Sequence, residues 1–186
     1  LANIDVTNGG ITLPGPIDMP AIVHTLQRHL PADAVLTNGA GNFASWLHRY
    51  IPYIGQQHHG RTQLAPTSGA MGYGVPAAVM ASIVAPERAT INFAGDGDFL
   101  MTSQELATAV QYGGAPICIV FNNGMYGTIR MHQEREHPSR VYGTQLVNPD
   151  FAKYGESFGG KGFTVTTNAE FDVAFGAERR EVLRCP

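Results

Sequence analysis

Charge is scarce in this chain. Its 186 residues include 12 Lys and Arg against 15 Asp and Glu, which gives a net charge of −3 and a charged fraction of 15%. A nucleic-acid-binding domain needs a cluster of basic side chains to meet the phosphates, and this composition provides no such surplus. The balance of charge therefore argues against nucleic acid as a partner.

Long apolar runs and cysteines are also scarce. A membrane-spanning helix needs roughly 20 consecutive apolar residues, and no segment reaches that length. We find no basic-then-apolar leader at the start of the sequence. Of the two cysteines, Cys118 lies in an apolar stretch and Cys185 is next to last, so neither indicates a disulfide framework or a metal site. These absences predict a protein of the reducing cytoplasm without membrane contact.

Glycine and apolar residues are abundant, with 22 glycines and a hydrophobic fraction of 44%. Segments with helical periodicity alternate with short apolar runs, a pattern typical of an α/β fold in which helices cover both faces of a parallel sheet. We therefore predict a three-layer α/β/α domain with a mainly parallel central sheet. The expected helices and strands are helix 18–29, strand 34–37, a helix ending near 50, a helix ending near 84, strand 89–94, a helix ending at 112, strand 117–121, helix 126–135, a helix from about 149, strand 162–166 and a helix from 168.

The two ends differ in composition from this central part. Residues 1–17 are rich in Gly, Pro, Asn and Thr and resemble a linker. Residues 177–186 are charged and short for the end of such a domain, so we expect a truncated or atypical tail. The domain itself is expected to span residues 18–176, and the whole to be a piece of a longer protein.

One strand–helix–strand unit carries the most specific signal. Gly95-Asp96-Gly97 follows the first strand, and Asn122-Asn123 follows the second. Between them, Thr102–Glu105 has the pattern of a capping box, and Gly113-Gly114 ends the helix. The carboxyl ends of parallel strands meet at one edge of the sheet, which is where ligands bind in open α/β folds.

The residue types at that edge indicate the ligand. A carboxylate at Asp96 and an amide oxygen at Asn123 are hard oxygen donors, and neighbouring strands lie roughly 4.8 Å apart, close enough for both to share an ion. Mg²⁺ is bound by one or two carboxylates together with substrate phosphates and water. The glycines beside these residues let backbone approach a phosphate closely. We therefore predict a site for a Mg²⁺-bridged diphosphate.

Three segments in the same order resemble thiamine-diphosphate-dependent enzymes, and most closely the acetolactate-synthase-like members. They are Thr67–Ala78, Gly95–Ala109 and Asn122–Gly127, and the resemblance extends from about Asp18 to about Phe175. It implies the thiamine-diphosphate-binding fold and, within it, the carboxyl-terminal domain that holds the diphosphate.

The resemblance also implies a set of ligand residues. Asp96, the side chain of Asn123 and the backbone carbonyl of Met125 would bind Mg²⁺. Met71 would support the bent cofactor, and Gly69 would present its carbonyl to the aminopyrimidine. At Asp98, where many relatives carry a small residue, we expect contact through the backbone. The implied cofactor-binding residues are Gly39, Gly41, Asn42, Gly69, Ala70, Met71, Gly95, Asp96, Gly97, Asp98, Asn123, Met125, Tyr126 and Gly127.

Two departures from the family pattern affect this set. The loop Gly39–Phe43 stands where relatives often carry Gly-x-His-Gln, which leaves its diphosphate contacts and any substrate role open. The tail lacks the Pro-led apolar strand with which relatives usually complete the sheet.

As a function, the resemblance implies a transferase or lyase that decarboxylates or ligates 2-oxo acids with thiamine diphosphate and Mg²⁺. In the family, a glutamate from a separate pyrimidine-binding domain activates the cofactor. We therefore expect no catalytic residue in this chain and no activity when it is alone. The expected partners are the pyrimidine-binding and central domains, in the same polypeptide or a partner subunit, and the full-length protein is expected to form a homo-oligomer.

Two alternatives stay open at this point. The chain could be a natural small (β) subunit of a split oxo-acid decarboxylase, active only with its partner. More remotely, it could be a nicotinamide-binding Rossmann domain, which requires Gly-x-Gly-x-x-Gly and an acidic residue about 20 residues further on. Here Gly39 and Gly41 are followed by Ala44, and no acidic residue lies between Gln57 and Gly60.

Overall fold

The structure is a computed structural model that describes residues 16–53 and 62–182. Its four described strands form one parallel sheet in the order β2-β1-β3-β4. Their bounds are Val35–Asn38 for β1, Gln63–Leu64 for β2, Thr90–Gly95 for β3 and Ile117–Phe121 for β4. The register places Asn38 opposite Phe93 and Gly95 opposite Phe121, so β1, β3 and β4 end at the same edge.

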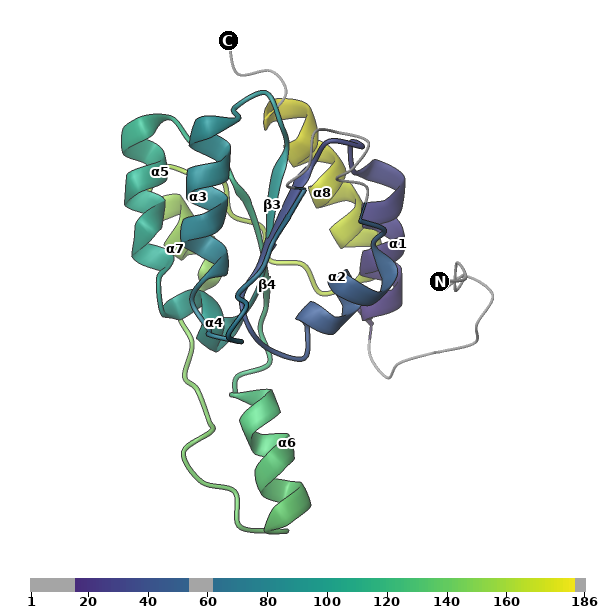
Figure 1. Cartoon of the computed structure of the whole chain (residues 1–186), viewed down its shortest axis with the longest axis vertical. Coiled ribbons are helices and arrows are strands. Elements are labelled where there is room, and N and C mark those ends of the chain that lie inside the picture. Colours follow the sequence, from purple (N-terminus) through teal and green to yellow (C-terminus); the bar gives the residue numbers. More distant parts are fainter. Residues whose placement is uncertain (1–15, 54–61, 183–186) are drawn as a thin grey trace.

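Helices cover both faces of the sheet (Figure 1). One face carries α1 (Met19–His29), α2 (Ala44–Tyr50) and α8 (Asn168–Val182). The other carries α3 (Gly74–Val84), α4 (Asp96–Leu100), α5 (Leu106–Tyr112) and α7 (Phe151–Ser157), with a short 3₁₀ helix, η1, at Ser103–Glu105. Helix α6 (Gly127–Glu136) projects away from the body beyond the carboxyl edge of the sheet. This architecture confirms the predicted three-layer α/β/α fold.

Strand β3 separates two apolar cores. Ile91 and Phe93 point into the cluster under α1, α2 and α8, whereas Ala94 belongs to the cluster under α3, α4 and α5. This division follows from the alternation of side chains along a strand. Full burial of a side chain as large as Phe93 contributes roughly 1.5–3 kcal/mol. Burial on both sides fixes the position of the strand that ends at Asp96.

Local signals in the sequence set several helix ends. Asp18 accepts the Ala21 N–H at 2.8 Å and begins α1, and Asp150 accepts the Lys153 N–H and begins α7. Gly113 ends α5 with φ +73°, a left-handed conformation that glycine adopts without steric cost. These starts and stops agree with the expectations from sequence.

The predicted capping box at Thr102 is wrong. The Thr102 hydroxyl does not cap a helix; it donates to the Gly72 carbonyl at 2.8 Å. A short 3₁₀ turn then leads into α5 at Leu106. The sequence Thr102–Glu105 is typical of a local cap, but the Thr102 hydroxyl bonds instead to Gly72, in another part of the chain.

The predicted strand at 162–166 is also wrong, since this segment is irregular. The backbone N–H of Thr166 donates to the Glu170 carboxylate at 2.7 Å instead of to a neighbouring strand. Glu170 also accepts the Thr167 N–H, and its own N–H donates to the Thr167 hydroxyl. These reciprocal bonds between Thr167 and Glu170 cap the start of α8, which begins at Asn168.

Two short structures were not expected from the sequence. Strand β2 lies between the helix expected to end near 50 and the helix expected to end near 84, and α4 begins at Asp96 directly after β3. At the carboxyl end, α8 continues through Val182 across the expected domain limit at 176. Most of the linker-like segment 1–17, and Cys185, lie outside the described residues. Over the described ranges, none of the helices has both the length and the apolar character to span a membrane.

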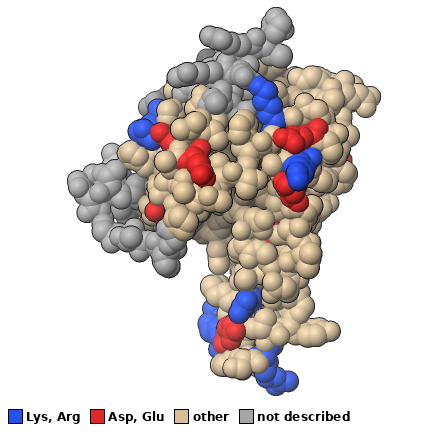
Figure 2. Space-filling view, turned by 180° about the vertical axis from the view of Figure 1, so that it is seen from behind, with Lys and Arg blue, Asp and Glu red and all other residues tan. Residues whose placement is uncertain are grey.

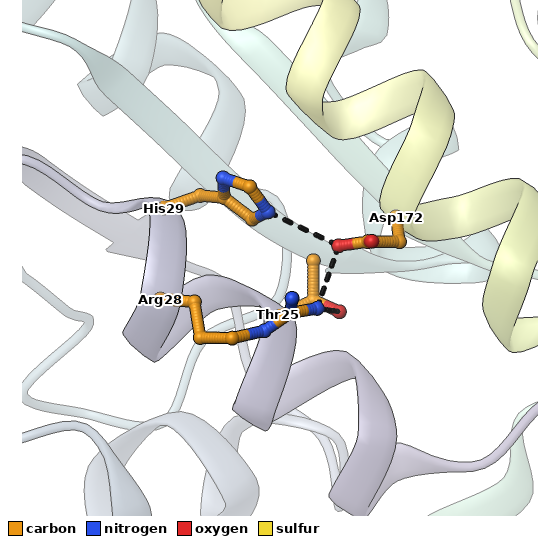
Figure 3. Close-up of polar contacts among 4 residues, drawn as sticks. All are labelled: Thr25, Arg28, His29 and Asp172. Atoms are coloured by element: carbon orange, nitrogen blue, oxygen red, sulfur yellow. Dashed lines mark hydrogen bonds and ion pairs between the residues drawn. The ribbon is translucent and has the colours of Figure 1, made fainter.

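Asp172 joins α8 to α1 (Figure 3). Its Oδ1 lies 2.7 Å from Arg28 Nη2 and 3.1 Å from His29 Nε2, and the same Arg28 nitrogen also donates to Thr25. Desolvation acts to raise the pKa of Asp172, but the hydrogen bond from His29 and the charge of Arg28 outweigh it and hold the pKa below its ordinary value. The ionised carboxylate is therefore favoured by folding.

We expect Asp172→Asn to lower the free energy of unfolding at neutral pH. Because the folded-state pKa is lowered, this contribution is present above the pKa of unfolded Asp, about 3.9, and is lost as the pH falls through the folded-state pKa. Urea denaturation of both proteins between neutral and acid pH checks this. Glu87→Gln, at an exposed acid, is the matched control. A difference between wild type and Asp172→Asn that grows toward acid pH would contradict the assignment.

Candidate functional site

A cleft of about 480 Å³ lies at the carboxyl edge of the sheet. Its walls come from the loops after β1, β3 and β4, from the turn before α3 and from the first turn of α6. The residues that line it are Ala40, Gly41, Asn42, Phe43, Gly69, Met71, Gly95, Asp96, Gly97, Asp98, Phe121, Asn123, Met125, Tyr126, Gly127, Thr128 and Ile129. The edge predicted to bind a ligand is therefore hollow.

Asp96 is the best-buried acid of the cleft together with Asp98, and only 3% of it is exposed. Its Oδ1 accepts the Gly97 N–H at 2.9 Å, and its Oδ2 accepts the Gly124 N–H at 2.8 Å and Asn148 Nδ2 at 2.7 Å. The carboxylate thus holds the loop after β4 against the end of β3. The two sequence motifs meet through this group, as predicted from their strands.

The loop after β4 is a tight turn. Asn123 Oδ1 accepts the Met125 N–H at 3.1 Å, and Gly124 has φ +68°. Two backbone hydrogen bonds pair this loop with the segment 144–146. The Leu146 N–H donates to the Gly124 carbonyl, and the Tyr126 N–H donates to the Thr144 carbonyl, so the two bonds flank Met125. Because successive residues of an extended segment bond on opposite sides, the Met125 carbonyl is directed away from that segment.

The oxygen atoms at this edge fit a hard divalent cation. Within the described ranges, no group of three or more His, Cys, Asp or Glu side chains could hold a metal, and no ion pair there includes Asp96. A site here would combine one buried carboxylate with amide and carbonyl oxygens. That donor set suits Mg²⁺, which completes its octahedron with phosphate oxygens and water.

Asp98 lies two residues further along α4 but has different partners. Its Oδ1 accepts the Gly72 N–H at 2.7 Å, and the Ala40 N–H also bonds to its carboxylate. Burial raises the pKa of Asp98, and these two backbone hydrogen bonds oppose the rise. The carboxylate is therefore held by the protein's own backbone.

Gly97 must be a glycine for steric reasons. A Cβ there would lie 2.4 Å from a ring carbon of Tyr126 and 3.2 Å from Leu146. The Tyr126 ring thus packs directly on the backbone that follows Asp96. This contact closes one side of the cleft.

Of the cofactor-binding residues implied by the sequence, all except Gly39 and Ala70 line the cleft. Phe43 and Phe121 were missed; they also line it, and their rings stack with centroids 6.0 Å apart. Asn148 was missed as well, although it bonds both to Asp96 and to Asn122 Oδ1. Asn148 lies in the loop before α7, and nothing in the local sequence connects it with the two motifs.

Comparison with known proteins agrees with the fold and the cleft. Residues 39–181 match the family described as thiamine pyrophosphate enzyme, C-terminal TPP binding domain. The chain is 35% identical over 160 residues to YdaP of Bacillus subtilis, whose name describes it as thiamine pyrophosphate-containing; the match covers 86% of this chain and 27% of that protein. It is 32% identical over 140 residues to the acetolactate synthase large subunit of Lactococcus lactis; the match covers 74% of this chain and 24% of that protein.

Among solved structures, the thiamine diphosphate-dependent 4-hydroxybenzoylformate decarboxylase of Rhodococcus jostii is similar, with a TM-score of 0.81 and 26% identity over 91% of this chain and 32% of that one. The chain spans about a quarter of the length of the curated relatives.

We expect Asn148→Ala to destabilise the protein and loosen the loop after β4. The substitution removes hydrogen bonds to Asp96 and Asn122, and a bond to a charged group contributes about 1.5–3 kcal/mol. Chemical denaturation measures the loss in the free energy of unfolding. Gln111→Ala, at an exposed position on α5, is the control. Equal free energies of unfolding for wild type and Asn148→Ala would show that the hydrogen bond to Asp96 does not stabilise the protein.

Proposed function

This chain belongs to the thiamine pyrophosphate enzyme family as its C-terminal cofactor-binding domain, and we propose that it holds the Mg²⁺-bridged diphosphate of thiamine diphosphate in the cleft at the carboxyl edge of the sheet. The observation that carries the proposal is the Asp96 carboxylate. It is buried at the end of β3 and is bonded directly to the turn that presents Asn123 and Met125. All three residues line the cleft, which supports the assignment of their carboxylate, amide and carbonyl oxygens to one metal.

In this proposal, Asp96, Asn123 Oδ1 and the Met125 carbonyl hold the metal. Asn123 Oδ1 accepts only the Met125 N–H in the structure, so it keeps a lone pair for the ion. Gly97, Asp98, Tyr126 and Gly127 lie along the diphosphate, with Asp98 contributing its backbone. Gly41 and Asn42 also line the cleft, and the Asn42 N–H donates to the Thr128 hydroxyl beside Gly127.

The same cleft extends to the turn before α3. Gly69 has φ +68° and lines the cleft together with Met71. We assign the Gly69 carbonyl to the aminopyrimidine and the Met71 side chain to support of the bent cofactor. When bound, the cofactor supplies an electron sink for cleavage or formation of the bond beside the carbonyl of a 2-oxo acid. The chain's own residues bind and orient it.

This domain alone is not expected to catalyse. Among the described residues that line the cleft, the acidic side chains are Asp96 and Asp98, and backbone N–H groups bind both carboxylates. Neither is placed as a free acid or base. A carboxylic acid that activates the pyrimidine would therefore come from a pyrimidine-binding domain, in the same polypeptide or in a partner subunit.

Helices α3 and α5 offer a surface for that domain. They pack beside each other and contain no charged residue. Met80 and Val84 on α3 are 60% and 67% exposed, and Val110 and Tyr112 on α5 are 60% and 63% exposed. Grouped apolar side chains of this kind mark interaction surfaces. We propose that this face packs in a homo-oligomeric full-length enzyme.

A nicotinamide-binding alternative receives no support. The loop after β1 carries Gly39 and Gly41 without the third glycine, and the family matched by the chain is one of thiamine enzymes. A small subunit of a split 2-oxo-acid decarboxylase stays compatible with the cleft. It would use the same residues and need the same partner domain.

Calorimetric titration of the chain with thiamine diphosphate, with and without Mg²⁺, tests the proposal. We expect binding that requires Mg²⁺ and is lost in Asp96→Ala, because removing a ligand should cost more than the roughly 10–100-fold lost with an outer-shell partner. Circular dichroism checks that the variant stays folded, and NAD⁺ is the control ligand.

Unchanged binding by Asp96→Ala would overturn the metal assignment. Binding of NAD⁺ without binding of thiamine diphosphate would overturn the proposed function. So would failure to bind thiamine diphosphate both alone and when supplied with a pyrimidine-binding domain.

A further inference from the structure

Asp98 connects two walls of the cleft that are distant in sequence. From the first turn of α4, its carboxylate accepts the Gly72 N–H, in the turn before α3, and the Ala40 N–H, in the loop after β1. Only 3% of the residue is exposed. No described ion pair provides a cation for this carboxylate. Backbone N–H groups from the two walls are thus the donors that hold it.

Gly72 is held on both sides. Its N–H donates to Asp98, and its carbonyl accepts the Thr102 hydroxyl at 2.8 Å. Gly72 also has φ +83°, a conformation that favours glycine. The segment from α4 to η1 therefore braces the turn that carries Gly69 and Met71.

Gly39 provides the space for the carboxylate. A Cβ built on Gly39 would overlap the Asp98 carboxyl group itself. Gly39 does not line the cleft, although the sequence predicted a cofactor contact there. Its missing side chain has a different role, since it lets Asp98 reach the backbone of Ala40.

The charge of this group has a physical consequence. A loop rich in backbone N–H groups would ordinarily bind an anion from the ligand. Here a side-chain carboxylate already bonds to the Ala40 and Gly72 donors. The protein itself therefore supplies the anion for the donors of these two walls.

We propose that Asp98 is a positioning residue that acts as an internal anion, joining the loop after β1 to the turn before α3 and so fixing two walls of the cleft before cofactor binds. Gly39 and Asp98 form one functional pair, in which the absent side chain of the first makes room for the carboxylate of the second. The inference rests on the proposed function only in taking the ligand to be thiamine diphosphate with Mg²⁺.

The clamp formed by Asp98 with Ala40 and Gly72 can be tested without cofactor. Amide hydrogen exchange by NMR is expected to show protected Ala40 and Gly72 amides in wild type and faster exchange at both in Asp98→Ser. The stabilities of Gly39→Ala, Asp98→Ser and the double variant should be non-additive, because alanine at position 39 clashes with the carboxyl group of Asp98, whereas a serine side chain is shorter and can adopt another rotamer to avoid it. Gly155→Ala, where a Cβ would meet no atom within 4 Å, is the matched control.

Positioning is tested by titrating thiamine diphosphate and Mg²⁺ into the same proteins. We expect Gly39→Ala and Asp98→Ser each to weaken affinity by about tenfold or more, and the double variant to match Asp98→Ser, as coupled residues do. Asp98→Asn keeps the shape but replaces one acceptor by a donor, so it should release one of the two amides and also weaken affinity. A merely structural role would lower stability and leave affinity unchanged.

The outcomes separate the two proposals. Failure of the wild-type chain to bind cofactor counts against the proposed function. Amide hydrogen exchange and the stabilities of the variants would still test whether Asp98 joins the two walls. The clamp would be overturned if the stability effects of Gly39→Ala and Asp98→Ser were additive, or if hydrogen exchange at Ala40 and Gly72 were unchanged in Asp98→Ser. A confirmed clamp with wild-type affinity in Asp98→Ser and Asp98→Asn would overturn the positioning role.

Discussion

A buried negative charge at the end of β3 is the constraint on which the cleft depends. Asp96 needs hydrogen-bond donors, because an unsatisfied buried carboxylate is costly. The donors come from Gly97 beside it, from Gly124 in the turn after β4 and from Asn148 before α7. Satisfying one charge therefore brings three segments together, and the turn that carries Asn123 and Met125 is placed as a result.

Asp98 uses the same chemistry for a different purpose. Asp96 and Asp98 both lie in the first turn of α4, where negative charge is favoured by the helix dipole. Their donors come from opposite sides: Asp96 is bonded toward β4 and α7, and Asp98 toward β1 and α3. Together the two carboxylates connect the loops after β1 and β4 and the turn before α3 to one short helix. Figure 2 shows charged side chains both on this face of the body and on the projecting segment that contains α6.

The sequence predicted what depends on local or strand-length patterns. Strand β4 has the predicted bounds because its apolar run is enclosed between Pro116 and Asn122. The predicted strand at 162–166 had the residue types of a strand but no neighbouring strand to bond, and the Glu170 carboxylate takes its N–H groups instead. Local patterns could not predict the contact of Thr102 with Gly72 or that of Asn148 with Asp96, because these partners are 30 and 52 residues away in the sequence.

The relatives differ in the reaction that their names describe, as acetolactate synthase and 4-hydroxybenzoylformate decarboxylase show. In the proposed arrangement, the wall formed by Asp96, Asn123 and Met125 would meet only the cofactor, so it would not account for that difference. In this chain, the loop at Gly39–Phe43 and position 98 both depart from the family pattern, and the start of this loop, at Gly39 and Ala40, lies against Asp98. A smaller residue at position 98 would leave the N–H donors of Ala40 and Gly72 without this carboxylate. Differences between relatives in the loop and at position 98 must therefore be compared together.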